Sequence, residues 1–313
     1  MHFCDLHCDT AVILYQTLQN LSDNTGCAVS LQKAGVFDKY IQCAAVFTDT
    51  YLSNEQGWEQ FFRVRRYFLD ECEKTHSLLC TDGGMLRNFL TDTTHRSAFV
   101  LTVEDARILN GHPERLGILY DAGVRLITPV WGGNSCIGGA HNTEDGLTPF
   151  GKKTVDEALS RGMIIDISHA SLPTADYILS LARQYPGQVC ASHSNAFALT
   201  PHRRNLQDDQ MYRLVQAGGI VGINLFVRFL GETEDVSAED VLRHMDYCLN
   251  LCGEDHVAFG CDFDGADTPA DLPDIASLTS LIPGLHRMGY SDDRIEKIFY
   301  KNACRFLAEA LGQ

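Results

Sequence analysis

The chain has 313 residues, and its 25 Lys and Arg stand against 41 Asp and Glu, which gives a formal net charge of −16. This charge argues against nucleic acid or an anionic membrane as a partner, because like charges repel unless counterions screen them. Hydrophobic residues make up 45% and charged residues 21%, a balance typical of globular rather than disordered proteins. A chain of this length can bury a sizeable core in one large α/β domain or in two smaller ones.

The N-terminal residues and the cysteines indicate the compartment. The first ten residues carry His2, Asp5, His7 and Asp9 and lack the basic and then apolar pattern of a secretion signal. No run approaches the roughly 18 apolar residues of a membrane span. The 12 cysteines form no Cys-x-x-Cys pair, and several lie inside apolar runs, so we interpret them as reduced, buried thiols. Together these observations predict a cytoplasmic protein.

Eight short apolar runs recur along the chain, and a longer stretch follows each of them. Most are nearly continuous rather than alternating, which is typical of parallel strands that are buried on both faces. In chain order they cover residues 3–7, 42–48, 98–104, 124–130, 163–168, 188–193, 219–226 and 256–262.

Amphipathic segments separate the later runs and predict helices, because their apolar residues recur three and four positions apart. Thr154, Ser171 and Ser237 are suitable N-terminal caps for three of them, and Ser291 opens a long C-terminal helix. The longest insertions are 49–97, with a helix expected at 58–74, and 131–151. The predicted helices cover residues 154–161, 172–183, 208–216, 238–251 and 292–311.

This alternation of strands and helices predicts a single (β/α)8 barrel of the TIM type. We expect one domain over residues 1–313, with extended loops after the second and fourth strands and a C-terminal helix. The alternative is a doubly wound open sheet, but the Gly-x-Gly-x-x-Gly turn that would follow its first strand is missing.

Metal-binding side chains gather at the ends of the predicted strands. In a barrel of this type the carboxyl ends of the strands form the active face. Imidazole and carboxylate are the ligands of zinc and its first-row neighbours. Each residue alone is explained more simply as a hydrogen-bonded core or loop residue, so the prediction of a metal site depends on their joint placement. Five of the eight strand ends carry such groups, which are His7, Asp9, Glu104, His169, His193 and Asp262.

The spacing of these residues suggests two ions. His7 and Asp9 are two positions apart, so along a strand both side chains point to one side and can bind the same ion. His169 and His193 follow adjacent predicted strands and suit a second ion, and Glu104 has two oxygens with which to bridge the pair. Two ions about 3.5–4 Å apart would hold a bridging hydroxide near neutral pH.

Asp262 is the carboxylate that this arrangement leaves unshared, and we expect it to carry a proton from the water to the leaving group. Asp5 lies inside the first strand, where it is either structural or a partner of a ligating histidine. Asp105 and Asp264 are expected to be loop acids, and His256, at the start of its strand, to be structural. The remaining histidines are expected to be solvated, apart from His141, which is treated below; they are His2, His76, His95, His112, His244 and His286.

Seven short motifs occur in an order that resembles the membrane (renal) dipeptidase family of zinc peptidases, within the amidohydrolase superfamily. The resemblance extends from residue 5 to about residue 302 and is to the shorter bacterial members, which lack a signal peptide and a lipid anchor. The motifs are Asp5-x-His7-x-Asp9, Val103-Glu104, the segment 146–151, Ile165-Asp-Ile-Ser-His169, Ser192-His193-Ser194, the segment 202–205 and Gly260-Cys-Asp262-Phe-Asp-Gly265.

The resemblance implies a barrel with two Zn²⁺ ions, for which Mn²⁺ or Co²⁺ could substitute on the same ligands. It places His7 and Asp9 on one ion, His169 and His193 on the other, and Glu104 on both. It also implies hydrolysis of L-L and L-D dipeptides and a tendency to form homodimers.

The resemblance further implies that Asp262 is the catalytic acid and base and that Arg204 binds the C-terminal carboxylate of a dipeptide. A planar guanidinium suits this role because it can donate two parallel hydrogen bonds to a carboxylate. The neighbouring Arg203 is expected to be a surface charge.

One segment departs from the family pattern. Members often carry a histidine after the fourth strand that polarises the scissile carbonyl, and here Trp131 stands at that position, or Pro129 if the gap falls differently. We predict that Trp131 contacts the substrate, although an indole N–H is a weaker donor than an imidazolium. His141, ten residues further on, is the alternative, if a mobile loop brings it to the site.

Two other functions stay open at this point. The same metal centre could hydrolyse another carboxylate-bearing amide or ester, such as an N-acyl amino acid or a lactone. The second alternative is an inactive barrel that only binds a ligand, but the complete set of site residues argues against it. The sequence therefore predicts a cytoplasmic metallodipeptidase that acts on a small-molecule dipeptide and binds neither nucleic acid nor membrane.

Overall fold

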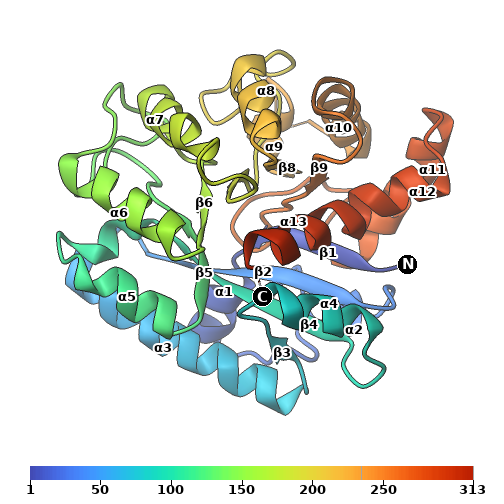
Figure 1. Cartoon of the computed structure of the whole chain (residues 1–313). Coiled ribbons are helices and arrows are strands. Elements are labelled where there is room, and N and C mark those ends of the chain that lie inside the picture. Colours follow the sequence, from blue (N-terminus) through green and yellow to red (C-terminus); the bar gives the residue numbers. More distant parts are fainter. Residues whose placement is uncertain (234, 313) are drawn as a thin grey trace.

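Eight parallel strands close into a barrel in the computed structural model of the chain, which describes residues 1–233 and 235–312 (Figure 1). Each barrel strand pairs with the next, and β1 also pairs with β9, which closes the ring. The prediction of a (β/α)8 barrel is confirmed. The barrel strands are β1 (Phe3–Cys8), β2 (Tyr40–Phe47), β4 (Ser97–Glu104), β5 (Val124–Thr128), β6 (Ile164–Asp166), β7 (Val189–Ala191), β8 (Ile220–Ile223) and β9 (Val257–Phe259).

A short additional strand, β3 (Leu78–Leu79), lies outside the barrel in the insertion before β4. It pairs with Ala98 and Phe99 near the start of β4, whereas β5 pairs with β4 from Leu101 onward. The sequence analysis did not predict this strand, because two residues are too few to show a periodicity.

Helices surround the barrel (Figure 1), and none within the described residues is long and apolar enough to cross a membrane. Two 3₁₀ helices, Ala106–Leu109 and Ile275–Ser280, supplement them. The α-helices are α1 (Thr10–Thr17), α2 (Leu31–Ala34), α3 (Asn54–Lys74), α4 (Gly83–Thr91), α5 (Glu114–Asp121), α6 (Pro149–Ser160), α7 (Leu172–Ala182), α8 (Asp208–Gln216), α9 (Val227–Leu230), α10 (Ala238–Cys252), α11 (Leu281–Arg287), α12 (Asp292–Glu296) and α13 (Asn302–Ala310).

Three predicted helix boundaries were wrong. The helix expected at 58–74 begins at Asn54, because the side chain of Ser53 accepts a hydrogen bond from the Gln56 N–H. Helix α6 begins at Pro149 rather than at residue 154, because the side chain of Thr148 accepts a hydrogen bond from the Gly151 N–H and Pro149 suits the first helical position. The predicted helix 292–311 is divided by a π-helical turn, Lys297–Lys301, between α12 and α13. A π turn adds a residue to the helical repeat, which apolar spacing alone does not reveal.

Helix α13 closes the amino-terminal end of the barrel, so that only the opposite end is open to a ligand. Phe306 and Leu307 of α13 pack in one buried cluster with Leu6, Ile41 and Val100 from the strands. All twelve cysteines are free, and all except Cys136 are buried, which agrees with the interpretation of reduced thiols.

The barrel wall is tightest where β8 and β9 pass the strand end that precedes His193. A Cβ atom on Gly222 would lie 2.0 Å from the carbonyl oxygen of Ser192, and one on Gly260 would lie 1.7 Å from the same oxygen. Non-bonded atoms do not approach this closely, so any larger residue at these positions must displace the backbone. Both glycines therefore support the backbone at one of the candidate metal ligands.

We expect Gly222→Ala to lower the free energy of unfolding by about 1–3 kcal/mol, because the added methyl group displaces the β7 backbone. Urea denaturation followed by circular dichroism measures this change. Gly132→Ala is the matched control, because no heavy atom lies within 4 Å of its added Cβ. Equal stabilities of the two variants would contradict the packing argument.

Candidate metal centre and substrate cavity

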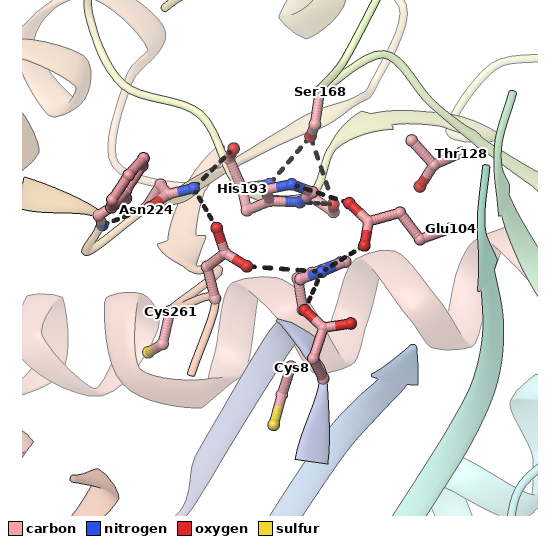
Figure 2. Close-up of polar contacts among 12 residues, drawn as sticks. Cys8, Glu104, Thr128, Ser168, His193, Asn224 and Cys261 are labelled. Carbon is pink, nitrogen blue, oxygen red and sulfur yellow. Dashed lines mark hydrogen bonds and ion pairs between the residues drawn. The ribbon is translucent and has the colours of Figure 1, made fainter. Parts of the chain in front are cut away.

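The six predicted metal-centre residues meet in one buried cluster at the open end of the barrel. His7 lies near the end of β1 and Glu104 is the last residue of β4. Asp9 follows β1 directly, and the other three lie two or three residues beyond the ends of β6, β7 and β9. Figure 2 shows the side chains of Glu104 and His193 pointing toward one another. Residues more than 250 positions apart in the chain thus form a single site, as the strand ends predicted.

The two imidazoles of His169 and His193 converge on one oxygen of Glu104. The Nε2 atom of His169 lies 2.9 Å from Oε1 of Glu104 and 2.9 Å from Nε2 of His193. Nε2 of His193 lies 3.6 Å from the same oxygen of Glu104. Ligands held about 2.0–2.1 Å from one tetrahedral ion lie roughly 3.0–3.5 Å from one another. The three atoms, which we call the histidine-pair side, are therefore spaced as ligands of a shared ion.

The other oxygen of Glu104 faces a second group. The Nε2 atom of His7 lies 3.6 Å from Oε2 of Glu104, 3.3 Å from Oδ2 of Asp9 and 3.8 Å from Oδ1 of Asp262. His7, Asp9 and Asp262 form a group whose potential ligand atoms all lie within 4.8 Å of one another. Glu104 consequently stands between two groups and presents one oxygen to each.

The unpartnered atoms of the cluster also fit a cation. Nε2 of His7 and Oδ1 of Asp9 are buried and have no hydrogen-bond partner. Such atoms are rare in folded proteins, because leaving them unpaired costs about 1–3 kcal/mol each. Three carboxylates buried together also repel one another. A divalent metal would satisfy both groups of ligands and offset this charge, so the residues present fit a metal.

The backbone of Trp131 orients His169. Nδ1 of His169 lies 3.1 Å from the carbonyl oxygen of Trp131, and since a carbonyl can only accept, the proton is on Nδ1. The lone pair of Nε2 then faces Glu104, which is the arrangement that a metal ligand requires. The ring centroid of the indole lies 5.8 Å from that of His169, on which it stacks, and 5.0 Å from that of Phe47, and the side chain lines the cavity.

Asp262 is held in a strained but well-supported position. Its φ angle is +61°, which few residues other than glycine adopt, and Asn224 Nδ2 donates to its Oδ2 at 3.0 Å. Burial raises the pKa of Asp262 to about 7, and the negative charges of Asp9 and Glu104 act in the same direction, although His7 opposes them. Bound cations would lower this pKa again, because they stabilise the charged form.

Asn224 was not identified from the sequence. The backbone N–H of Asn224 donates a hydrogen bond to Oδ1 of Asn195. Nδ2 of Asn195 donates to the backbone carbonyl of Asn224, so the Asn195 side chain fixes the backbone of Asn224. The available signal was a polar residue inside the apolar run 219–226, close to the active end of a strand.

A cavity of about 400 Å³ opens above the cluster, and Arg204 is buried in its wall. Its Nη2 donates to the carbonyl oxygen of His193 at 3.3 Å, but its Nε and Nη1 have no partner. Burial lowers the pKa of Arg204 to about 10, so the side chain stays charged at neutral pH. A buried cation with free donors fits a carboxylate. Arg203, in contrast, is exposed and pairs with Glu144, as expected of a surface charge.

His141 also lines this cavity, and hydrogen bonds connect its loop to the site. Its backbone N–H donates to the carbonyl of His169 at 2.8 Å, and Asn134 donates to Asp145 within the same loop. Burial and the charge of Arg204 lower the pKa of His141 to about 3, so its imidazole is neutral. Trp131 and His141 thus line the cavity together.

The other acids and histidines have structural contacts. Asp5 accepts hydrogen bonds from the backbone of His7 and Cys261, and Asp105 pairs with Arg107 at 2.9 Å. The carboxylate of Asp264 accepts hydrogen bonds from the hydroxyl of Thr10 and the backbone N–H of Ala28, and the side chain also lines the cavity. His256 contacts the carbonyl of Gly219, far from the site, as predicted.

The expectation for His244 was wrong. This side chain is fully buried in α10, where its ring contacts the backbone of Ala196 and Leu230 and the hydroxyl of Thr200. Its partners come from distant loops, which the sequence around it does not indicate.

Comparisons with known proteins agree with this geometry. A family model described as membrane dipeptidase (peptidase family M19) matches residues 1–311. An uncharacterised protein from the pqqA 5′ region of Klebsiella pneumoniae is 36% identical over 228 residues, which are 69% of this chain and 83% of that protein. Dipeptidase aclJ of Aspergillus oryzae is 32% identical over 221 residues, 68% of this chain; the match spans only 52% of that protein.

Two solved structures share the whole fold. A metallopeptidase from Rhodobacter sphaeroides, liganded with a phosphinate mimic of the dipeptide L-Ala-D-Ala, is 25% identical with a TM-score of 0.88, and the alignment covers 100% of this chain and 99% of that one. A metallopeptidase named dipeptidase AC has a TM-score of 0.89 at 24% identity, with the same coverage.

Proposed function

Because the chain belongs to the membrane dipeptidase family, peptidase family M19, we propose that it hydrolyses dipeptides at a centre of two zinc ions. Membership makes the chain a metallopeptidase and a hydrolase. The observation that carries the proposal is the position of Glu104, whose Oε2 faces His7 and whose Oε1 faces His169 and His193. A carboxylate in this position suits two ions better than one.

The ligands are divided between the two ions as follows. His7 and Asp9 would hold one, His169 and His193 the other, and Glu104 both. Two such ions, when bound, supply Lewis-acid polarisation of the scissile carbonyl and activation of a water molecule. Three imidazoles and two carboxylates favour zinc, while manganese and cobalt suit the same ligands.

The walls of the cavity carry opposite charges, as a zwitterionic substrate requires. Arg204 would bind the C-terminal carboxylate of the dipeptide through its unpaired Nε and Nη1 donors. Asp49 and Asp264 also line the cavity, and their negative charges would attract the ammonium group of a dipeptide. The peptide bond would then lie over the metal centre, between these two regions, with Trp131 as an apolar wall.

Asp262 would move the proton. Its carboxylate reaches into the same cavity, and Asn224 fixes one of its oxygens, so the other is free to take a proton from water and deliver it to the leaving amine. Hydrolysis of L-D as well as L-L dipeptides is part of the proposal. It is supported by the L-Ala-D-Ala mimic bound to the Rhodobacter sphaeroides relative.

Metal removal tests the proposal as a whole. We expect about two zinc ions per chain and cleavage of L-L and L-D dipeptides that is lost on chelation and restored by zinc. Elemental analysis and an amine-release assay on one preparation measure both. Two bound metals without cleavage of any dipeptide would instead favour another carboxylate-bearing amide or ester, such as an N-acyl amino acid or a lactone.

Substitution of Arg204 tests how the substrate binds. We expect Arg204→Ala to lower kcat/KM for a dipeptide about 10- to 100-fold, the equivalent of roughly 1.5–3 kcal/mol for a hydrogen bond to a charged group. The same variant should cleave the corresponding dipeptide amide as well as the wild type does. Arg203→Ala is the control and should behave as the wild type. A loss that is equal for acid and amide would contradict carboxylate binding.

Substitution of Asp262 tests the proton carrier. We expect Asp262→Asn to lower kcat by at least about 100-fold while the metal content stays at the wild-type level. Asp255→Asn, on the surface, is the control. Loss of metal together with activity would make Asp262 a ligand rather than a proton carrier, and unchanged kcat would remove it from the mechanism.

A further inference from the structure

Asp166, the last residue of β6, is a fully buried carboxylate that accepts hydrogen bonds from three adjacent strand ends. The hydroxyl of Thr128 donates to it from β5 at 2.8 Å. Ser168 donates through its backbone N–H at 3.0 Å and its hydroxyl at 2.6 Å, and Ser192, after β7, does the same at 2.8 and 2.6 Å. All five partners are donors, so the carboxylate is satisfied without a cation beside it.

One of these bonds continues to a candidate metal ligand. Oγ of Ser192 lies 2.6 Å from Oδ2 of Asp166 and 2.7 Å from Nδ1 of His193. The carboxylate can only accept, so the single hydroxyl proton is directed to Asp166, where the bond is charge-assisted. The Ser192 oxygen is then an acceptor for His193, whose proton must be on Nδ1.

This chain of hydrogen bonds leaves the Nε2 lone pair of His193 facing Glu104 and His169. The backbone of His193 is held as well, because its N–H donates to the hydroxyl of Ser168 at 3.0 Å (Figure 2). We infer that Asp166 and Ser192 are positioning residues, which select the metal-binding tautomer of His193 and so set the affinity of the histidine-pair side for its ion. The inference rests on the proposed metal centre.

The two histidines of this side differ in their support. Nδ1 of His169 is bound by the backbone carbonyl of Trp131, whereas Nδ1 of His193 is bound by a side chain. The rings of His7 and His193 lie 3.8 Å apart, but within the described residues no hydrogen bond joins His7 or Asp9 to Asp166, Ser168 or Ser192. A change at Ser192 should therefore act on one ion and leave the other unchanged.

The test is zinc binding by the full-length protein, without any substrate. Zn²⁺ affinities of the wild type and of Ser192→Ala are measured by competition with a chromogenic chelator. We expect the variant to bind one ion as the wild type does and the second about 10- to 100-fold more weakly, the usual effect of removing a partner of a ligating histidine. Thr128→Val is the matched control, since it removes one hydrogen bond to Asp166 but no contact with His193.

Asp166→Asn provides a second variant of almost unchanged size. An amide group facing Ser192 would donate to it, turn the hydroxyl proton toward Nδ1 of His193 and favour the tautomer that cannot bind metal. We expect the same single ion to be weakened. Wild-type affinity for both ions in Ser192→Ala, or equal weakening in Thr128→Val, would overturn the inference. A wild type that binds no zinc would overturn the proposed function itself.

Discussion

The structure of the active end depends on the burial of Glu104 between two groups of imidazoles and carboxylates. Buried charges cost several kcal/mol each unless they are paired, and this cluster holds Asp9 and Asp262 beside Glu104. Divalent cations offset that cost and would make the site a product of folding and metal binding together. The buried atoms of His7 and Asp9 that lack a hydrogen-bond partner are consistent with this view.

The barrel meets this constraint by bringing together side chains from the ends of β1, β4, β6, β7 and β9. His7 and the segment that carries Asp262 lie side by side only because β1 pairs with β9, the contact that closes the ring. Gly222 and Gly260 allow the β7 end to approach closely enough for His193 to reach the cluster. The strand pairing that closes the barrel therefore also brings the site residues together. A substitution that disturbs the packing around the β7 end would also move His193.

Positioning is divided between hydrogen bonds of different kinds. A backbone carbonyl orients His169, a serine and a buried carboxylate orient His193, and an asparagine pair holds Asp262. Asn224 also donates to the carbonyl oxygen of His193, so the supports of His193 and Asp262 are linked.

The cluster of candidate ligands could be predicted from the sequence alone, because parallel strands of a barrel end at one rim and His7, Glu104 and His193 stand at such ends. The apolar runs likewise determined the fold class. Only the tertiary structure decided the roles of Asp166 and Asn224, the burial of His244, and the difference between Arg204 and Arg203. The physical reason is that periodicity and spacing report on the backbone of one segment. Hydrogen bonds between side chains of different strands, and the water that they exclude, exist only once the strands have met.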